Sequence, residues 1–395
     1  MNRISLGIRR ATTHIIVAGV GLALITSVKN AQAADVPAFQ VRAGYKVTLA
    51  ASGFGQARFM AMGPNGTLWV SQPGPGNIVT LKRQNDNTYK KIADFTTGKQ
   101  SVHGMQYVNG WLWFTQSGTI WKARDTDNDG HADEEVKVLD GLPSGGGHWW
   151  RPICVTDTGF YTGVGDDGNI NDHTGDDREK IWFYNLDGTG KTLWASGTRN
   201  TEKLMLRPGT QEVWGADHGS DWFGKPLGDV NGNQPFTDRI PPCEFNRYDK
   251  DGFYGHPFIM GNGMARLEFK DRPDILDLSK KTILPQWALG AHWAPNGWTF
   301  ANSDALGAKG DAFIACHGSW NSSVRVGYRV ERIMFDSETG TPMGAQCIVS
   351  TLNADGKDLA RPVDCIEDTD GSLLFSDDTG NNDRIFRVSK TSIPQ

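Results

Sequence analysis

The stretch Asn65-Gly66-Thr67-Leu68-Trp69-Val70 is a tight turn followed by a short run of alternating apolar character. A second apolar run, residues 78–81, follows, and the two together have the form of a β-hairpin. The same pattern recurs along the chain, with copies beginning near residues 65, 109, 158, 211, 311 and 370. Regular internal repetition of short strands predicts an all-β propeller with six four-stranded blades. A sandwich or another barrel shares the short strands but not the repetition.

Composition agrees with this fold class. The 395 residues include 48 Gly, 14 Trp and 18 Phe, which favours many tight turns and aromatic strand residues over amphipathic helices. One long gap, about residues 225–295, separates the fourth and fifth copies and contains a helical candidate around Asp274 to Lys280. We interpret this gap as an elaborated loop on the functional face, within a single propeller domain over residues 34–395.

The first 33 residues have the pattern of a cleavable secretory signal peptide. Basic residues, among them Arg9 and Arg10, precede an apolar stretch at residues 15–25, and an Ala-Gln-Ala cleavage site ends at Ala33. The apolar stretch is too short for a membrane span, and no later segment approaches the length of one. The mature protein is therefore expected in the periplasm or outside the cell, with Sec and Tat export both left open.

The mature chain would be acidic, because residues 1–33 contain four basic residues and no acidic one, leaving 36 basic against 45 acidic residues. This balance argues against nucleic acid or an anionic membrane as partner, and it suits a small substrate or a basic electron carrier. Five cysteines allow one or two disulfides and leave one thiol over. The absence of Cys-x-x-Cys or Cys/His spacing argues against a zinc site.

Three runs contain residues suited to chemistry: GGGHWWR at 145–151, GTRN at 197–200 and CHGSWN at 316–321. Glycines before His148 let the backbone approach a ligand closely, and a histidine is the natural general base near neutral pH. Arg199 offers a planar, permanently charged fork of donors. A loop histidine and a surface arginine are the plainer interpretations of the same residues.

In this order the three runs resemble the sorbosone dehydrogenase and soluble pyrroloquinoline quinone (PQQ)-dependent sugar (pyranose) dehydrogenase family, whose members are β-propellers. The resemblance covers most of the mature chain. It implies that His148 removes the substrate hydroxyl proton, with Arg151 and Asp166 at the matching positions nearby. It also implies that Arg199 and Asn200 contact the quinone carbonyls.

Further cofactor contacts follow from the same resemblance, namely His317, Trp320, Asn321 and Arg361. The His-Gly-Ser-Trp-Asn run follows the sorbosone and fungal pyranose branch, whereas the glucose enzymes have a Lys in this blade. The glucose enzymes also have a second Arg two positions before Arg361, where this chain has Leu359. His103 and His292 are expected either to line the cavity or to be buried and satisfied.

Calcium is expected at two places. The run 125–133 has carboxylates at Asp125, Asp127, Asp129 and Asp133 with Gly130 at the turn, a spacing that wraps oxygen ligands around a hard cation. It lacks the Glu of an EF-hand at position 12, so a solvated acidic turn is the alternative. The resemblance places a second calcium, next to the cofactor, at the loop formed by Gly219, Ser220 and Asp221.

The sequence therefore predicts a periplasmic quinoprotein that oxidises an aldose or a sugar aldehyde such as sorbosone, with hydride transfer to PQQ. Without a Cys-x-x-Cys-His haem site, the electrons must pass to an external acceptor such as a cytochrome c or a quinone. Two alternatives stay open. One is a calcium-dependent propeller lactonase, and the other is a non-catalytic binding propeller.

Overall fold

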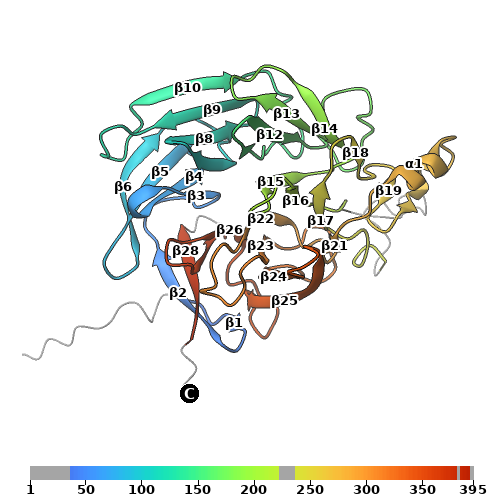
Figure 1. Cartoon of the computed structure of the whole chain (residues 1–395). Coiled ribbons are helices and arrows are strands. Elements are labelled where there is room, and N and C mark those ends of the chain that lie inside the picture. Colours follow the sequence, from blue (N-terminus) through green and yellow to red (C-terminus); the bar gives the residue numbers. More distant parts are fainter. Residues whose placement is uncertain (1–35, 222–235, 380–382, 392–395) are drawn as a thin grey trace, which may run out of the picture.

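The computed structural model describes residues 36–221, 236–379 and 383–391. The predicted signal peptide lies outside these residues. The described chain forms a six-bladed β-propeller, whose colours in Figure 1 run around the ring in sequence order. The first strands of neighbouring blades contact one another in a closed circle, from β3 through β7, β11, β15, β22 and β26 back to β3.

Each blade contains four antiparallel strands, and blades three and five each have a fifth. Blades one and two contain, in order, β3 (Met60–Met62), β4 (Thr67–Gln72), β5 (Asn77–Arg83) and β6 (Tyr89–Thr96), then β7 (Met105–Val108), β8 (Trp111–Gln116), β9 (Thr119–Arg124) and β10 (Glu134–Leu139). Blades three and four contain β11 (Cys154–Val155), β12 (Gly159–Val164), β13 (Lys180–Asn185) and β14 (Thr192–Ser196), then β15 (Thr201–Leu206), β16 (Val213–Asp217), β17 (Glu244–Tyr248) and β21 (Trp287–Ala288). Blades five and six contain β22 (Pro295–Phe300), β23 (Ala312–Cys316), β24 (Arg329–Phe335) and β25 (Pro342–Ser350), then β26 (Pro362–Glu367), β27 (Leu373–Asp377), β28 (Arg384–Lys390) and β2 (Tyr45–Ala51).

The repeated sequence pattern corresponds to one strand position in every blade. The six copies are the second strands, β4, β8, β12, β16, β23 and β27. In the first two blades an Asn-Gly pair precedes this strand, and both residues of each pair have positive φ, 54° and 69° at Asn65 and Gly66. That conformation matches the right-handed twist of the joined strands. Because all six copies are strands at the same position of a blade, the prediction of six blades is confirmed.

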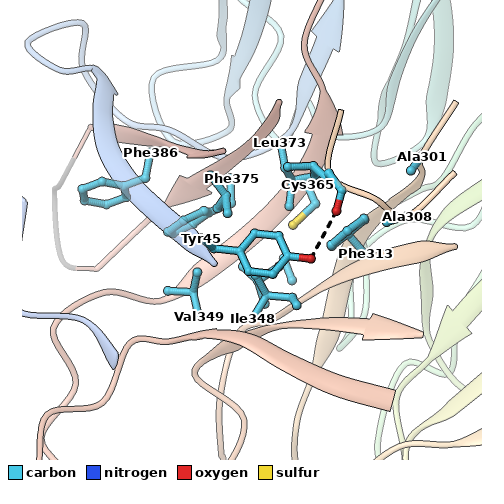
Figure 2. Close-up of a cluster of buried hydrophobic side chains, with 14 of the residues drawn as sticks. Tyr45, Ala301, Ala308, Phe313, Ile348, Val349, Cys365, Leu373, Phe375 and Phe386 are labelled. Atoms are coloured by element: carbon cyan, nitrogen blue, oxygen red, sulfur yellow. Dashed lines mark hydrogen bonds between the residues drawn. The ribbon is translucent and has the colours of Figure 1, made fainter. Parts of the chain in front are cut away.

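The ring closes through its N-terminal strands. β2 pairs with β28 and completes the last blade, while β1 (Gln40–Val41) pairs with β25 as a fifth strand of blade five. Figure 2 shows Tyr45 of β2 among Phe313, Ile348 and Phe375 of these two blades. Its hydroxyl donates a hydrogen bond to the carbonyl of Leu306 at 3.3 Å. β2 is therefore part of the core.

The long gap in the repeats is partly blade and partly insertion. β17 and β21 belong to blade four, and between them lie β18 (Gly252–Phe253), β19 (Ile259–Met260), β20 (Met264–Ala265) and α1 (Ile275–Lys281). The helix agrees with the candidate at Asp274 to Lys280. β18 adds to β14 as a parallel fifth strand of blade three, which ties the insertion to that blade. Short 3-10 turns occur at Pro64–Gly66 and Leu267–Phe269.

All five cysteines lie in the described chain and none forms a disulfide. Four of them are buried, and burial raises the pKa of the Cys154 thiol to about 12. These thiols therefore behave as small apolar core residues rather than as cross-links or nucleophiles. The described part of the chain also contains no helix with the length and apolar character that a membrane span requires.

Candidate functional site

The loops that carry the predicted residues meet at one face of the propeller. In an up-and-down blade, the loop after the second strand and the loop leading to the next blade emerge at the same end. His148 lies in the loop before blade three, Arg199 in the loop before blade four, and Trp320 follows the second strand of blade five. Together with His218, Asp221 and His292 they line one pocket, along with Gly219, Cys243 and Ala294. The structure thus brings together residues that are far apart in the sequence.

His148 is held as a neutral base. Its Nδ1 lies 2.8 Å from the carbonyl oxygen of Asp166, which can only accept, so Nδ1 carries the proton and Nε2 keeps its lone pair. Burial, and secondly the charge of Arg199, lower the pKa of His148 to about 3. The residue has a positive φ of 24°, an uncommon conformation for a residue with a side chain. His148 therefore lines the pocket with Nε2 left as a hydrogen-bond acceptor.

Arg199 is a fixed positive charge at the same pocket. Its guanidinium donates to the carbonyl and the side-chain oxygen of Asn169, both at 2.9 Å, and to the carbonyl of Gly219 at 3.0 Å. Its backbone N–H is held by the buried carboxylate of Asp217 at 2.9 Å. Because hydrogen bonds hold both the backbone and the guanidinium of Arg199, its charge is fixed at the pocket. The guanidinium lies 3.5 Å from a carboxylate oxygen of Asp221.

Asn200 connects the pocket to the propeller axis. Its amide nitrogen lies 3.2 Å from Nδ1 of His218 and 3.3 Å from a carboxylate oxygen of Glu202. His218 in turn lies with Nε2 3.2 Å from the carbonyl of Pro295. Burial, followed by the charge of Arg199, lowers the pKa of His218 to about 3. His218 was not among the residues selected from the sequence, because nothing in its motif distinguishes it from a structural loop histidine.

A chain of ion pairs runs from this pocket across the axis. Arg58 bonds Glu202 at 3.2 Å and Asp378 at 3.0 Å. His317 bonds Asp378 through Nε2 at 2.7 Å, and its Nδ1 accepts from Arg361 at 2.9 Å. His317 and Arg361, both expected to contact the cofactor, are thus hydrogen-bonded to each other. They do not line the pocket themselves and are connected to Asn200 through Asp378, Arg58 and Glu202. Arg58, Glu202 and Asp378 were not identified from the sequence.

Arg151 occupies a different position from the one expected of a cofactor contact. Its guanidinium donates to the carbonyls of His148 at 2.8 Å, Trp150 at 3.1 Å and Pro143 at 2.5 Å, and the side chain is fully buried. Burial, with the neighbouring charge of Arg178, lowers its pKa to about 9. These contacts give Arg151 the position of a residue that shapes the loop of His148.

The remaining aromatic and histidine candidates divide between surface and core. Trp320 is 72% exposed at the mouth of the pocket, and Asn321 beside it has a positive φ of 54°. His292 is buried with Nε2 2.7 Å from the carbonyl of Thr237. His103 is fully buried between Phe59 and Trp150, with ring centroids at 3.9 and 4.9 Å. His292 therefore both lines the pocket and is satisfied. His103 is buried, but neither of its ring nitrogens has a hydrogen-bond partner, and Nε2 lies 3.5 Å from Oε2 of Glu202.

The two predicted calcium sites differ in whether their oxygen atoms already contact positively charged side chains. Asp125, Asp127 and Asp133 place carboxylate oxygens within 4.8 Å of one another, and Asp129 is not part of that group. All four carboxylates accept hydrogen bonds from backbone N–H groups of the same turn. In the second loop, the Gly219 carbonyl accepts from Arg199, and the Ser220 hydroxyl accepts from Arg266 at 2.6 Å. A cation at Gly219, Ser220 and Asp221 would have to share these oxygens with two guanidinium groups.

The donor set at the pocket suits a planar, anionic group rich in acceptors. Arg199 supplies positive charge, and the buried Nδ2 of Asn169, next to Arg199, has no hydrogen-bond partner. PQQ carries three carboxylates and two quinone oxygens, which require such donors. The charge at the pocket therefore fits this cofactor, with Arg199 as the pocket residue that would hold it and Asn169 as the residue that positions Arg199.

Comparison with known proteins supports the family resemblance. A family model described as TrAA12-like matches residues 274–391. A protein of Borreliella burgdorferi described only as uncharacterized is 32% identical over 212 residues, 53% of this chain and 51% of its own length. The chain thus spans about half the length of that curated relative.

Solved structures extend the likeness over the whole propeller. The calcium structure of the Trichoderma reesei carbohydrate-active enzyme of family AA12 has a TM-score of 0.76 at 18% identity, over 90% of this chain and 98% of that one. The holo PQQ domain of the pyranose dehydrogenase from Coprinopsis cinerea has a TM-score of 0.75 at 19% identity, over the same shares. The soluble aldose sugar dehydrogenase of Escherichia coli has a TM-score of 0.63 at 16% identity, over 88% of this chain and all of that one. This chain shares their fold.

Proposed function

We propose that this protein is a PQQ-dependent dehydrogenase that oxidises a sugar. The observation that carries the proposal is His148, whose Nδ1 is fixed on the Asp166 carbonyl while Nε2 is left as an acceptor beside the charge of Arg199. A base next to a fixed cation is what removal of a hydroxyl proton beside an anionic electron acceptor requires. The shared fold with the pyranose and aldose sugar dehydrogenases supports the same conclusion.

In this proposal the chain's own residues handle the proton and the charge. As the C–H bond of the sugar carbon breaks, Nε2 of His148 takes the hydroxyl proton and a carbonyl forms on the substrate. When bound, PQQ would supply the two-electron acceptor for the hydride, and the electrons would go on to an external acceptor. Arg199, anchored by Asn169 and Gly219, holds negative charge in place without having to reorganise. Asn200 keeps His218 oriented at the pocket wall.

An anionic ligand also solves a difficulty with His148. A base whose pKa is about 3 is weak at neutral pH. Burial is the main cause of the low pKa and the charge of Arg199 is the second, so carboxylates placed against Arg199 would offset that second part and raise the basicity of His148. The pocket is therefore better suited to catalysis with an anionic cofactor than without one.

The finer assignments belong to the same proposal. The substrate is an aldose or a sugar aldehyde such as sorbosone, calcium accompanies the cofactor, and the enzyme works in the periplasm with a soluble acceptor. The lactonase alternative needs carboxylates at the axis that are free to bind a central metal. Here Glu202 and Asp378 pair with Arg58, and Asp364 pairs with Lys203, so no observation favours it.

Reconstitution tests the proposal. The protein lacking residues 1–33 is mixed with PQQ and calcium, and dye reduction is followed with a panel of aldoses, sorbosone and simple alcohols. We expect reduction that needs the cofactor and a sugar. Absence of both dye reduction and a PQQ-induced absorbance change or thermal shift would contradict the proposal.

The variant His148→Ala separates catalysis from binding. We expect turnover to fall at least 100-fold, since general base catalysis contributes roughly 10²–10⁴-fold, while PQQ affinity changes by less than about fivefold. His131→Ala is the matched control, because His131 is an exposed histidine outside the pocket. Equal turnover in the two variants would show that His148 is not the base.

A further inference from the structure

Three ionisable side chains from separate parts of the chain meet between blade three and the insertion. Asp166 follows β12, Glu179 directly precedes β13, and His256 belongs to the insertion after β18. Nε2 of His256 lies 3.0 Å from Oδ2 of Asp166 and 3.3 Å from Oε1 of Glu179. One atom from each residue lies within 4.8 Å of the other two. The cluster adjoins the pocket described above, because the backbone carbonyl of Asp166 bonds His148 and His256 lines a neighbouring cavity with Arg199 and His218.

Hydrogen bonding alone does not satisfy this cluster. A histidine Nε2 carries at most one proton, yet here it faces two carboxylates, and Asp166 is the nearer one. Glu179 is only 3% exposed, and its buried Oε1 has no hydrogen-bond partner. Asp166 already accepts from the backbone N–H groups of Gly168 and Asn171. A protonated His256 would supply one positive charge, but its single Nε2–H is nearer to Asp166 and leaves Oε1 of Glu179 without a donor of its own. Such an oxygen is costly to bury, and a cation between the three side chains would give it a partner.

We propose that Asp166, Glu179 and His256 form a binding site for a divalent transition metal of the zinc class. Zinc binds imidazole nitrogen and carboxylate oxygen at about 2.0–2.2 Å in tetrahedral geometry, which places neighbouring ligand atoms about 3.4 Å apart. The separations of 3.0 and 3.3 Å from Nε2 are close to that edge length. A metal also gives Oε1 of Glu179 the partner that it lacks. The fourth position is left for water.

Neighbouring groups explain why the metal belongs here and not in the adjacent cluster. Asp166, Asp167 and His173 also converge, but there each group has its own hydrogen bond. His173 bonds Asp176 through Nδ1 at 2.7 Å and Asp167 through Nε2 at 3.0 Å, and Asn171 donates to Asp167 at 2.7 Å. That cluster is complete without a metal.

The site would join the insertion to the blade that carries the candidate base. His256 and Asp166 are 90 residues apart in the sequence, so no short motif could reveal the site. The absence of Cys-x-x-Cys or Cys/His spacing bears only on ligands that are close in sequence. Asp166 uses its side chain here and its backbone carbonyl to hold His148. The inference rests on the geometry of these three residues and not on the proposed function.

Zinc binding to the protein itself provides the test. Protein lacking residues 1–33 and any polyhistidine tag is stripped with a chelator and titrated with zinc chloride by calorimetry, without PQQ. Millimolar calcium is present to occupy the turn at residues 125–133. We expect one zinc per chain with a Kd below about 1 µM. His256→Gln and Glu179→Gln should each weaken binding at least tenfold, whereas the control His173→Gln should change it less than threefold.

Three outcomes would overturn the inference. The first is a folded wild-type protein that binds no stoichiometric zinc. The second is zinc binding that persists in both His256→Gln and Glu179→Gln, and the third is zinc binding that is lost instead in His173→Gln. Circular dichroism shows whether each variant is folded. If the His256 variant does not fold, X-ray absorption of the zinc-loaded wild type decides, because the site requires one imidazole, oxygen ligands and no sulfur.

Discussion

His148 and His218 are two histidines that the fold keeps neutral, and this links stability to pH. Burial, then Arg199, lowers the pKa of each to about 3, against about 6.5 in an unfolded chain. Between pH 6.5 and 3 the unfolded state therefore binds more protons than the folded state, so stability falls as the pH falls through this window. Each histidine contributes a slope of up to about 1.4 kcal/mol per pH unit.

The variant His218→Asn tests this linkage. The free energy of unfolding is measured by denaturant titration at pH 7 and pH 5 in wild type and variant. We expect the variant to be less stable at pH 7, because its contacts with Asn200 and Pro295 change, but to lose up to about 2 kcal/mol less than the wild type on acidification. Equal losses in the two proteins would show that His218 is not held neutral by the fold.

Single residues also show what the sequence could and could not predict about the site. His148 and Arg199 were predictable, because glycine-rich runs and a charged fork leave local signals, and the pocket contains both. Glu202, Arg58 and His218 were not, because they gain their roles from partners in other blades. The run that contains Arg151 suggested a cofactor contact, but the guanidinium of Arg151 donates to carbonyls of its own loop.

At the scale of elements, β2 closes the ring, and its Tyr45 side chain is the main buried anchor. Tyr45 is 8% exposed within the cluster of Figure 2. Tyr45→Ala should lower the free energy of unfolding by about 3–5 kcal/mol through the cavity it creates, and Tyr45→Phe by about 1 kcal/mol through the lost hydroxyl bonds. Denaturant unfolding measures both. Lys46→Ala is the control on the exposed face of the same strand, and a loss there as large as in Tyr45→Ala would refute the anchoring role.

Other elements explain how far the fold was predictable. The six second strands carry turn chemistry and alternating residues, so their positions followed from the sequence. β18 has only two residues, Gly252–Phe253, and pairs in parallel with β14. β1 likewise pairs with β25 through two residues. Strands this short depend on contacts with a remote partner, so the fifth strands of blades three and five had no local signal.

At the scale of the whole molecule, buried ion pairs across the axis join blades that are not neighbours. Lys203 of β15 in blade four donates to Asp364 of β26 in blade six at 2.6 Å, and the second oxygen of Asp364 accepts from the N–H of Met60 in blade one at 2.9 Å. Burial raises the pKa of Asp364, and the charge of Lys203 opposes that rise. One carboxylate therefore links three blades.

Removing the cation should make stability depend on pH in a direction opposite to that of the histidines. In Lys203→Met the pKa of Asp364 is no longer lowered by its partner, so the folded state holds a proton to higher pH than the unfolded state does. Stability is then retained at low pH and lost as the pH rises. We expect the free energy of unfolding of Lys203→Met to be lower than that of wild type by about 3–5 kcal/mol at pH 8 and by clearly less at pH 5, measured by denaturant unfolding.

The control is the double variant Lys203→Met/Asp364→Asn, which has no carboxylate to titrate. Its loss of stability should be the same at both pH values. A deficit in Lys203→Met that is equal at both pH values would mean that the axial pair acts through packing and not through charge.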